Sequence, residues 1–170
     1  NLYGYEAGGN GPESGRHAIR FAPGTGELGM FQGAKSYLLE NPEGQTLDTY
    51  SISAGLDYAS VGPEHAWLKD IGRVNYSWAT DREAMSAFKD LCETEGIIPA
   101  IESSHAVAGA YKAAADLKAK GYEHPVMIIN ISGRGDKDMN TAGKWFGYLT
   151  DEQAKALESN GAQGNNADGE

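Results

Sequence analysis

Residues 126–138 read VMIINISGRGDKD, an apolar run of strand type that ends in a polar, glycine-rich turn. An open α/β sheet binds its ligands at the carboxyl ends of its strands, because backbone donors and short side chains emerge there from a rigid base. Ser132 stands directly at this exit, followed by Gly133. From the residues alone, a hydroxyl that only satisfies the turn and a hydroxyl that binds a ligand atom both remain open.

Two further segments repeat the pattern of a short apolar strand followed by polar residues. Residues 97–105 read IIPAIESSH, and residues 50–57 read YSISAGLD. We predict strands over 97–101 and 50–56, each delivering an acidic side chain at its end. Three such exits make a ligand site at one edge of a sheet a reasonable expectation.

Helix signals lie between these strands. Thr80 and Glu83 form a capping box, and the apolar period that follows predicts a helix over 81–95 that ends at Gly96. The residues before the box, 73–78, are typical of a strand. Helix and strand therefore alternate in this part of the chain.

Two more helices are expected. One begins at Ser103 or Ser104 as N-cap and ends at Gly121, and a short one begins at Pro63. Strands that are apolar throughout and alternate with helices indicate a sheet covered on both faces. We therefore predict an α/β fold with a mostly parallel sheet and helices on both faces.

The length of 170 residues suits one domain, which we place at 1–150, followed by an acidic helix and a mobile tail at 151–170. The net charge is −10, and residues 151–170 carry five acids against one lysine. This balance argues against nucleic acid and anionic membranes as partners, since both require clustered Lys and Arg. No apolar stretch approaches the length of a membrane span.

Cysteine and histidine give no sign of a metal site or a disulfide. Cys92 is the only cysteine, which favours a reducing compartment and the cytoplasm, and it is expected as a small apolar core residue. His65 and His105 match no spacing typical of metal ligands. We expect structural roles for both histidines.

Three motifs together carry a family resemblance. SISAGLDYASVGPEH at 51–65, IPAIESSHA at 98–106 and NISGRGDKD at 130–138 closely resemble, in order and spacing, the C-terminal half of the tryptophan synthase β chain, a pyridoxal-phosphate enzyme of fold type II. The resemblance implies that family's C-terminal domain for residues 1–150. It also implies a lyase that replaces the hydroxyl of L-serine by indole, giving L-tryptophan and water.

The resemblance implies roles for particular residues. Ser132 would hydrogen-bond the pyridine nitrogen of the cofactor, and as a neutral partner it would leave that nitrogen largely unprotonated. Glu102 follows an apolar run and precedes a helix start, so we expect partial desolvation to shift its pKa. By the resemblance, Glu102 would lie over the cofactor near its ring, and Asp57 would contact the hydroxyl side of the serine substrate. A helix-start acid and a solvated loop acid are the structural alternatives for these two carboxylates. The other cofactor-binding residues that the resemblance implies are Gly133, Gly55, Ala100 and Ser103.

A monovalent cation, Na⁺ or K⁺, is also implied. The backbone carbonyls of Tyr58 and Ser60 match the family's cation ligands, and hard cations prefer such oxygen donors. Ala59 stands where the family usually has proline, a difference that could loosen this loop. We expect the oppositely charged Arg134, Asp136 and Lys137 to form an ion-paired turn that stiffens the Ser132 loop.

Two elements of the family's cofactor site are absent from this sequence. The family attaches the cofactor through a lysine in an N-terminal motif and holds its phosphate with a GGGSN loop, and neither motif occurs among these residues. We expect the isolated chain to be inactive, as a piece of a larger protein.

The resemblance further implies a β-chain homodimer flanked by α chains. Another fold-type II enzyme, such as a cysteine synthase or threonine dehydratase, and a non-catalytic module that binds a protein partner remain alternatives.

Overall fold

The computed structural model describes the backbone of residues 1–164 and the side chains of residues 1–157. The strands are β1 (Leu2–Ala7), β2 (Glu27–Phe31), β3 (Ala34–Leu38) and β4 (Val74–Ala79). The α-helices are α1 (Pro63–Asp70), α2 (Asp81–Glu95), α3 (Ile101–Ala119), α4 (Met139–Trp145) and α5 (Asp151–Gly164). Short 3-10 turns are η1 (Pro12–Ser14), η2 (Ala54–Leu56) and η3 (Asp136–Asp138).

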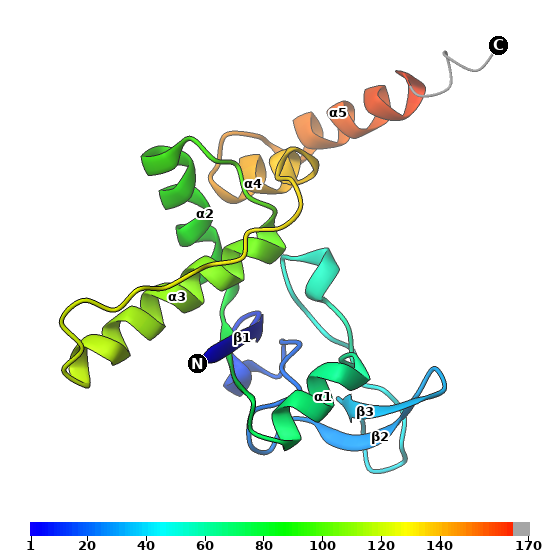
Figure 1. The fold of residues 1–170 in the computed structure, drawn as a ribbon. Coiled ribbons are helices and arrows are strands. Elements are labelled where there is room, and N and C mark those ends of the chain that lie inside the picture. The colour runs from blue at the N-terminus through cyan, green and yellow to red at the C-terminus, as the bar shows by residue number, and fades with distance from the viewer. Residues whose placement is uncertain (165–170) are drawn as a thin grey trace.

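The strands form two small sheets. β1 and β4 pair in parallel, with Leu2 opposite Val74 and Ala7 opposite Ala79. β2 and β3 form an antiparallel hairpin, which lies near α1 (Figure 1). The α/β class with a parallel sheet is therefore confirmed. The larger sheet with helices on both faces is not formed by the described residues, in which each sheet has two strands.

Helix α2 begins and ends where the sequence predicts. The Thr80 backbone N–H donates to Glu83 Oε2 at 2.8 Å, and the Glu83 N–H donates to Thr80 Oγ1 at 3.3 Å, which completes the capping box. Gly96 closes the helix in the left-handed conformation, with φ of 66°. These signals are local, so the chain around them is enough to specify the helix.

The core lies where α2 packs on α3. One cluster joins Ala79, Ala87, Val107 and Ala108, with Ile131 against it. A second cluster joins Met85, Phe88, Ile101 and Ala142 and so brings α4 onto the start of α3. Figure 1 shows α2 and α4 gathered at the N-terminal end of α3, while the rest of α3 extends away from them. The start of α3 is thus the best-packed part of that helix.

The strands predicted at 50–56, 97–101 and 126–131 are wrong. Residues 50–56 are irregular apart from the turn η2, and residues 97–100 are irregular up to the start of α3 at Ile101. The segment 126–131 is irregular and runs along α3 without a strand partner (Figure 1). A strand forms only where a neighbour satisfies its backbone N–H and C=O groups, and the described residues supply none for these segments. An apolar composition was therefore not sufficient to make these segments form strands.

The predicted start of α3 is also wrong. The helix begins at Ile101 with Ala100 as N-cap, three residues before Ser103 and four before Ser104, the two expected caps. The Ser104 hydroxyl instead donates to the carbonyl of Ala100 at 3.2 Å, inside the first turn. The side chain of Asp138, from a distant part of the chain, caps the helix instead.

The acidic C-terminal segment forms α5, which continues through residue 164. The rest of the predicted tail, 165–170, lies outside the described residues. Among the helices that the structure describes, none combines the length and the apolar character needed to cross a bilayer.

Gly109 allows β1 to approach α3. A Cβ at this position would lie 2.3 Å from ring atoms of Tyr5, so Gly109→Ala should force the helix and the strand apart and destabilise the chain by about 1–3 kcal/mol. Gly62→Ala is the matched control, because position 62 has φ of −60° and open space around it. Urea unfolding measures both variants. Equal stability of the two would contradict this packing.

Candidate functional site

Three segments far apart in sequence meet at the first turn of α3. Glu102, the second residue of that helix, accepts a hydrogen bond from the backbone N–H of Gly55 to Oε1 at 2.9 Å. Its other oxygen, Oε2, lies 2.8 Å from Nζ of Lys137. One carboxylate therefore ties the turn η2 and the loop before α4 to the helix. The position near a helix N-terminus also favours its negative charge.

Gly55 fits this site because it has no side chain. A Cβ at this position would lie 2.5 Å from Oε1 of Glu102, closer than carbon and oxygen can approach. Glycine thus lets the backbone N–H reach the carboxylate directly. The role of Gly55 in cofactor binding stays a prediction.

The loop after residue 131 is attached to the same turn of α3. The Ser103 hydroxyl donates to the backbone carbonyl of Ser132 at 2.6 Å. Gly133 has φ of 74°, and a Cβ there would contact the Cβ of the buried Ala100 at 3.5 Å. The structure therefore brings together six residues that the sequence singled out: Gly55, Ala100, Glu102, Ser103, Ser132 and Gly133.

Ser132 presents a free hydroxyl. The residue is exposed, and its side chain has no hydrogen bond to any residue that the structure describes. Only its backbone carbonyl is engaged, by Ser103. The turn is therefore held through the backbone, and the hydroxyl is left available for a ligand.

Asp138 caps α3 from a distance of 37 residues along the chain. Its Oδ2 accepts the backbone N–H of Ile101 at 2.9 Å. A carboxylate in this position satisfies a helix N–H that has no partner within the helix and interacts favourably with the helix dipole. Lys137 lies 2.8 Å from Asp138 as well as from Glu102 and so bridges the two carboxylates.

The ion pair sets the charge of Glu102. Partial burial alone would raise the pKa of this carboxyl, but the hydrogen bonds from Lys137, from its own backbone N–H and from Gly55 outweigh burial and hold the pKa below its usual value. Glu102 is therefore ionised at neutral pH. The sequence suggested a pKa shifted by partial desolvation, but the contacts with Lys137 and the two N–H groups reverse the direction that burial alone would give.

The predicted ion-paired turn is only partly formed. Arg134 and Asp136 pair on the surface at 3.3 Å, whereas Lys137 leaves the turn and pairs with Glu102 and Asp138. The role of Lys137 and the cap supplied by Asp138 were missed by the sequence reasoning. The only signal for them was the alternation of acid, lysine and acid in the GDKD run at 135–138.

Asp57 and Tyr58 lie in a loop held by a buried arginine. Arg20 donates from Nη1 to the carbonyl of Tyr58 at 2.6 Å. Nε of Arg20 lies 2.9 Å from Oε1 of the buried Glu6, at ion-pair distance but without the alignment of a hydrogen bond. Oδ1 of Asp57 is buried and has no hydrogen-bond partner among the described residues. A ligand could satisfy that oxygen.

The predicted cation site does not fit this arrangement. The Tyr58 carbonyl already accepts from a guanidinium, whose positive charge would repel a second cation at the same oxygen. Ser60 pairs with Leu38 in an isolated bridge, and its hydroxyl donates to the Val61 carbonyl at 3.3 Å. No contact in the described residues supports a cation here.

Asp81 and His105 are buried polar residues near η2 and the start of α3. Asp81 accepts the backbone N–H of Ile52 at 3.1 Å, and burial raises the pKa of this carboxyl. His105 is fully buried with Nδ1 2.9 Å from the Ile101 carbonyl, and burial lowers the pKa of its ring. No group of three or more side chains that could hold a metal ion occurs within the described part of the chain. A structural role for His105 stays a prediction.

The chain resembles known proteins over most of its length. It is 59% identical over 148 residues to the tryptophan synthase beta chain of Mycobacterium tuberculosis, which is 87% of this chain and 34% of the relative. The corresponding protein of Mycobacterium leprae is 56% identical over 149 residues, and that of Bordetella parapertussis is 51% identical over 146 residues. These matches cover 87% and 86% of this chain, and 34% and 35% of the two relatives. No protein-family model matches the chain.

The fold defines an α/β protein with polar loops gathered at the start of one helix. The comparisons name the family: the chain belongs to the tryptophan synthase beta chains and matches their C-terminal portion. It spans about a third of the length of these relatives.

Removing Lys137 should raise the pKa of Glu102. In Lys137→Met the carboxyl loses its cationic partner, so its pKa should move up towards the ordinary value, as followed by NMR titration of the Glu102 side chain. In the parent chain, the stability that Glu102 contributes is present above its unfolded pKa and is lost as pH falls through the lower folded pKa. Lys137→Met should flatten that dependence.

Lys112→Met is the matched control for that titration. Lys112 pairs with Glu83 at 2.8 Å, so this variant should raise the pKa of Glu83 and leave that of Glu102 unchanged. An unaltered Glu102 pKa in Lys137→Met would show that the ion pair does not exist in solution.

Loss of the cap on α3 should cost stability. Asp138→Ala leaves the Ile101 N–H without its acceptor and should lower the free energy of unfolding by about 0.5–2 kcal/mol. Asp136→Ala removes only an exposed partner of Arg134 and should change it by less than about 0.5 kcal/mol. Urea unfolding distinguishes the two. Equal losses would argue against the cap.

Proposed function

We propose that this chain forms one side of the pyridoxal-phosphate site of a tryptophan synthase beta chain of the fold-type II class. The complete protein would replace the hydroxyl of L-serine by indole and release L-tryptophan and water. The family membership supports this proposal. The observation that carries it is the convergence on Glu102 of three segments, η2, the first turn of α3 and the loop 132–138.

The residues present fit the ring side of such a cofactor. Ser132 offers a hydroxyl with no partner among the described residues, and it would face the pyridine nitrogen. Gly133 lies beside Ala100, and Gly55 lies beside Glu102. Because glycine has no side chain, both positions leave space at the site. Ser103 would act by holding the Ser132 backbone in place.

When bound, pyridoxal phosphate withdraws electrons from the carbon atoms of an amino-acid substrate. A serine hydroxyl at the ring nitrogen moderates that withdrawal, because a neutral partner does not hold the nitrogen protonated as a carboxylate would. Ser132 would thus favour replacement at the β-carbon over competing reactions. This role needs only a hydroxyl at position 132.

The two carboxylates would have separate tasks. Glu102, ionised and held by Gly55 and Lys137, would be a fixed negative charge near the ring and an acceptor rather than a donor of protons. Asp57 has a buried oxygen without a described partner, and it would accept a hydrogen bond from the hydroxyl of serine. Asp57 would therefore orient the substrate. The Tyr58 carbonyl, which accepts from Arg20, would take no part as a cation ligand.

The rest of the site would come from the other part of the protein. The nine lysines of this chain include none in the family's cofactor-binding motif, so the chain alone is expected to be inactive. We also propose a cytoplasmic protein that assembles as a beta-chain homodimer flanked by α chains. These assembly proposals rest on the family alone.

Changing Ser132 tests the proposal. The protein is completed by joining the preceding part of the Mycobacterium tuberculosis beta chain to this chain, and tryptophan formation from serine and indole is measured with added pyridoxal phosphate. Ser132→Ala should lower turnover about tenfold, as expected for one lost hydrogen bond of about 1.4 kcal/mol, and Ser132→Thr should recover most of it. Equal activity of all three proteins would reject the role of Ser132.

The same completed protein distinguishes the alternatives. Consumption of sulfide in place of indole would favour a cysteine synthase. Absence of the cofactor's absorbance band would favour a non-catalytic module.

A further inference from the structure

An arginine is buried beside the loop that carries Asp57. Arg20 is 6% exposed, and its ion-pair partner Glu6, near the end of β1, is 5% exposed. A charge in the interior is costly unless it is paired and hydrogen-bonded, and arginine stays protonated at neutral pH. Arg20 therefore carries a full positive charge into the interior next to this loop.

Glu6 anchors Arg20 on β1. Its Oε1 accepts the backbone N–H of Arg20 at 3.0 Å, and its Oε2 accepts that of Phe21 at 3.0 Å. The same Oε1 lies 2.9 Å from Nε of Arg20. One carboxylate therefore holds both the backbone and the side chain of Arg20, so the position of the guanidinium is fixed from the side of the strand.

The guanidinium also binds a backbone oxygen of the loop 57–60. Nη1 of Arg20 donates to the Tyr58 carbonyl at 2.6 Å, a short hydrogen bond of the charge-assisted kind. The next carbonyl, that of Ala59, accepts the backbone N–H of Leu39 at 2.9 Å. Two successive carbonyls of the loop are therefore already engaged, one by a positive charge and one by an amide.

Two carboxylates act on the guanidinium. Burial lowers the pKa of Arg20, whereas the charges of Glu6 and Asp57 act in the opposite direction. Oδ1 of Asp57 is buried and has no hydrogen-bond partner among the described residues. Two carboxylates and a carbonyl oxygen around one positive charge are the surroundings that a hard cation prefers. Arg20 supplies that charge from within the chain.

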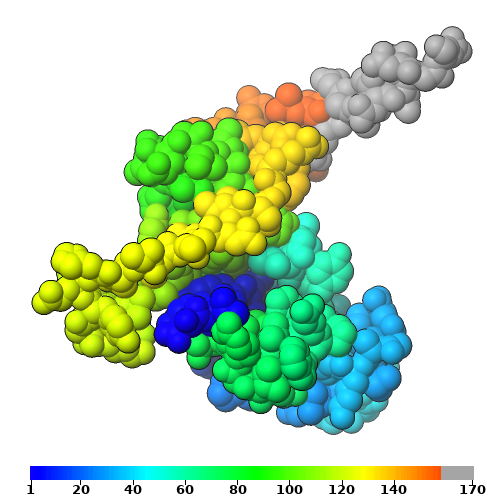
Figure 2. All heavy atoms as spheres, viewed as in Figure 1, coloured from blue at the N-terminus to red at the C-terminus, as the bar shows by residue number. Residues whose placement is uncertain are grey.

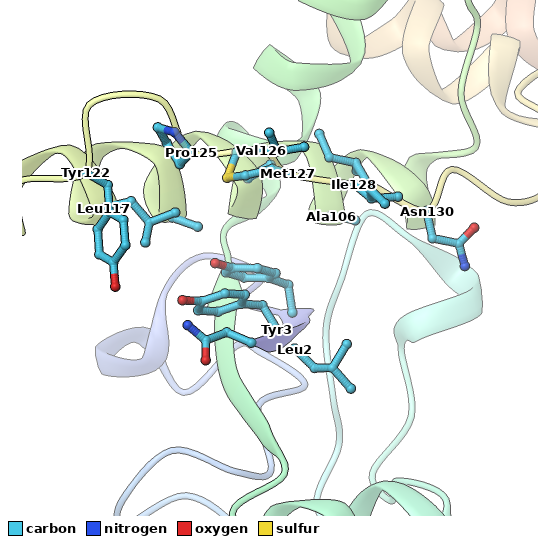
Figure 3. A pocket seen from close by; sticks show the side chains of 15 residues that line it. Leu2, Tyr3, Ala106, Leu117, Tyr122, Pro125, Val126, Met127, Ile128 and Asn130 are labelled. Carbon is cyan, nitrogen blue, oxygen red and sulfur yellow. The ribbon is translucent and has the colours of Figure 1, made fainter.

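This charged cluster is separate from the open hollow on the other side of β1. The hollow, of about 710 Å³, lies between the blue β1 and the yellow segment that follows α3 (Figure 2). In Figure 3, Leu2 and Tyr3 belong to one wall and Ile128 to the opposite wall. No charged side chain lines the hollow, and neither Glu6 nor Arg20 borders it. The guanidinium therefore lies in a packed part of the molecule.

We propose that the Arg20 guanidinium is a built-in cation for the loop 57–60 and takes the place of the free monovalent ion expected at the carbonyls of Tyr58 and Ser60. A second cation on the Tyr58 oxygen would lie next to the guanidinium and be repelled by it. Arg20 is a positioning residue, because it acts on the loop that carries Asp57 through a backbone carbonyl. The inference concerns the charge that supports this loop, and it stands without the proposed reaction.

Thermal unfolding in different salts tests the inference. The completed protein described above is studied without pyridoxal phosphate, in the chlorides of choline, sodium, potassium and caesium at equal ionic strength. An ion that binds only the folded protein raises the unfolding midpoint as its concentration exceeds its dissociation constant. The parent midpoint should agree in all four salts to within about 1 °C.

Two substitutions of Arg20 make the test specific. Arg20→Ala removes the charge and opens space, so its midpoint should fall in choline and rise again, saturably and by about 2 °C or more, with potassium or caesium. Arg20→Met removes the same charge but fills the space with an apolar side chain, so no ion should restore it. Arg16→Ala is the control, because Arg16 is exposed over the Tyr50 ring at 4.2 Å, and it should respond to salts as the parent does.

Two results would overturn the inference directly. One is a parent midpoint that rises saturably with sodium, potassium or caesium, because a free ion would then bind in spite of Arg20. The other is an equal response of Arg20→Ala and Arg20→Met to the ions. If Arg20→Ala stays unfolded in every salt, Arg20→Lys decides, because it keeps a positive charge: a folded protein without a salt response supports the inference, and any other result rejects it.

The outcome is separate from that of the proposed function. A parent that does not respond to the ions and makes no tryptophan would retain this inference and reject the proposed reaction. A parent that potassium stabilises and that makes tryptophan would do the reverse.

Discussion

The contact between Glu102 and Lys137 organises the candidate site. Glu102 lies at the start of a 19-residue helix, where the helix dipole favours a carboxylate, and it reaches both the Gly55 N–H and the Lys137 ammonium. Asp138 caps the same helix and shares the lysine. Exposed ion pairs contribute little to stability, but this one is partly buried, bridges two carboxylates and joins three segments. Its main effect is to fix where the loops lie.

The core beneath the site explains why the start of α3 is a suitable base. Ile101 packs with Met85, Phe88 and Ala142, so the first turn of the helix is held by α2 and α4. Asp81 and His105 add buried polar contacts to the loop at 51–52 and to the helix backbone. A rigid base of this kind lets a short side chain such as Ser103 position a neighbouring loop through one hydrogen bond.

The sequence predicted what local signals specify. The capping box and the final glycine specified α2 to the residue, because all of these groups lie within the helix or next to it. The strands at 97–101 and 126–131 were not formed, because their backbone groups need partners that the described residues do not supply. The apolar runs at these positions nevertheless indicate a tendency to form strands. It is visible in the alternating exposure of residues 126–129.

The same distinction holds for the site. The family motifs marked Gly55, Glu102 and Ser132, and the structure brings them to one turn of α3. The contacts of Lys137, Asp138 and Arg20 bridge 35 to 38 residues of chain and have no local signature. Arg20 in particular could not be foreseen as the partner of the Tyr58 carbonyl, and that contact removed the support for a cation.

The most direct measurement is a crystal structure of the completed protein with pyridoxal phosphate bound. The account predicts the Ser132 hydroxyl within hydrogen-bond distance of the pyridine nitrogen, about 3 Å, while Glu102 keeps its contact with the Gly55 N–H. A ring nitrogen bound by any other side chain, or a cofactor placed away from the first turn of α3, would contradict it.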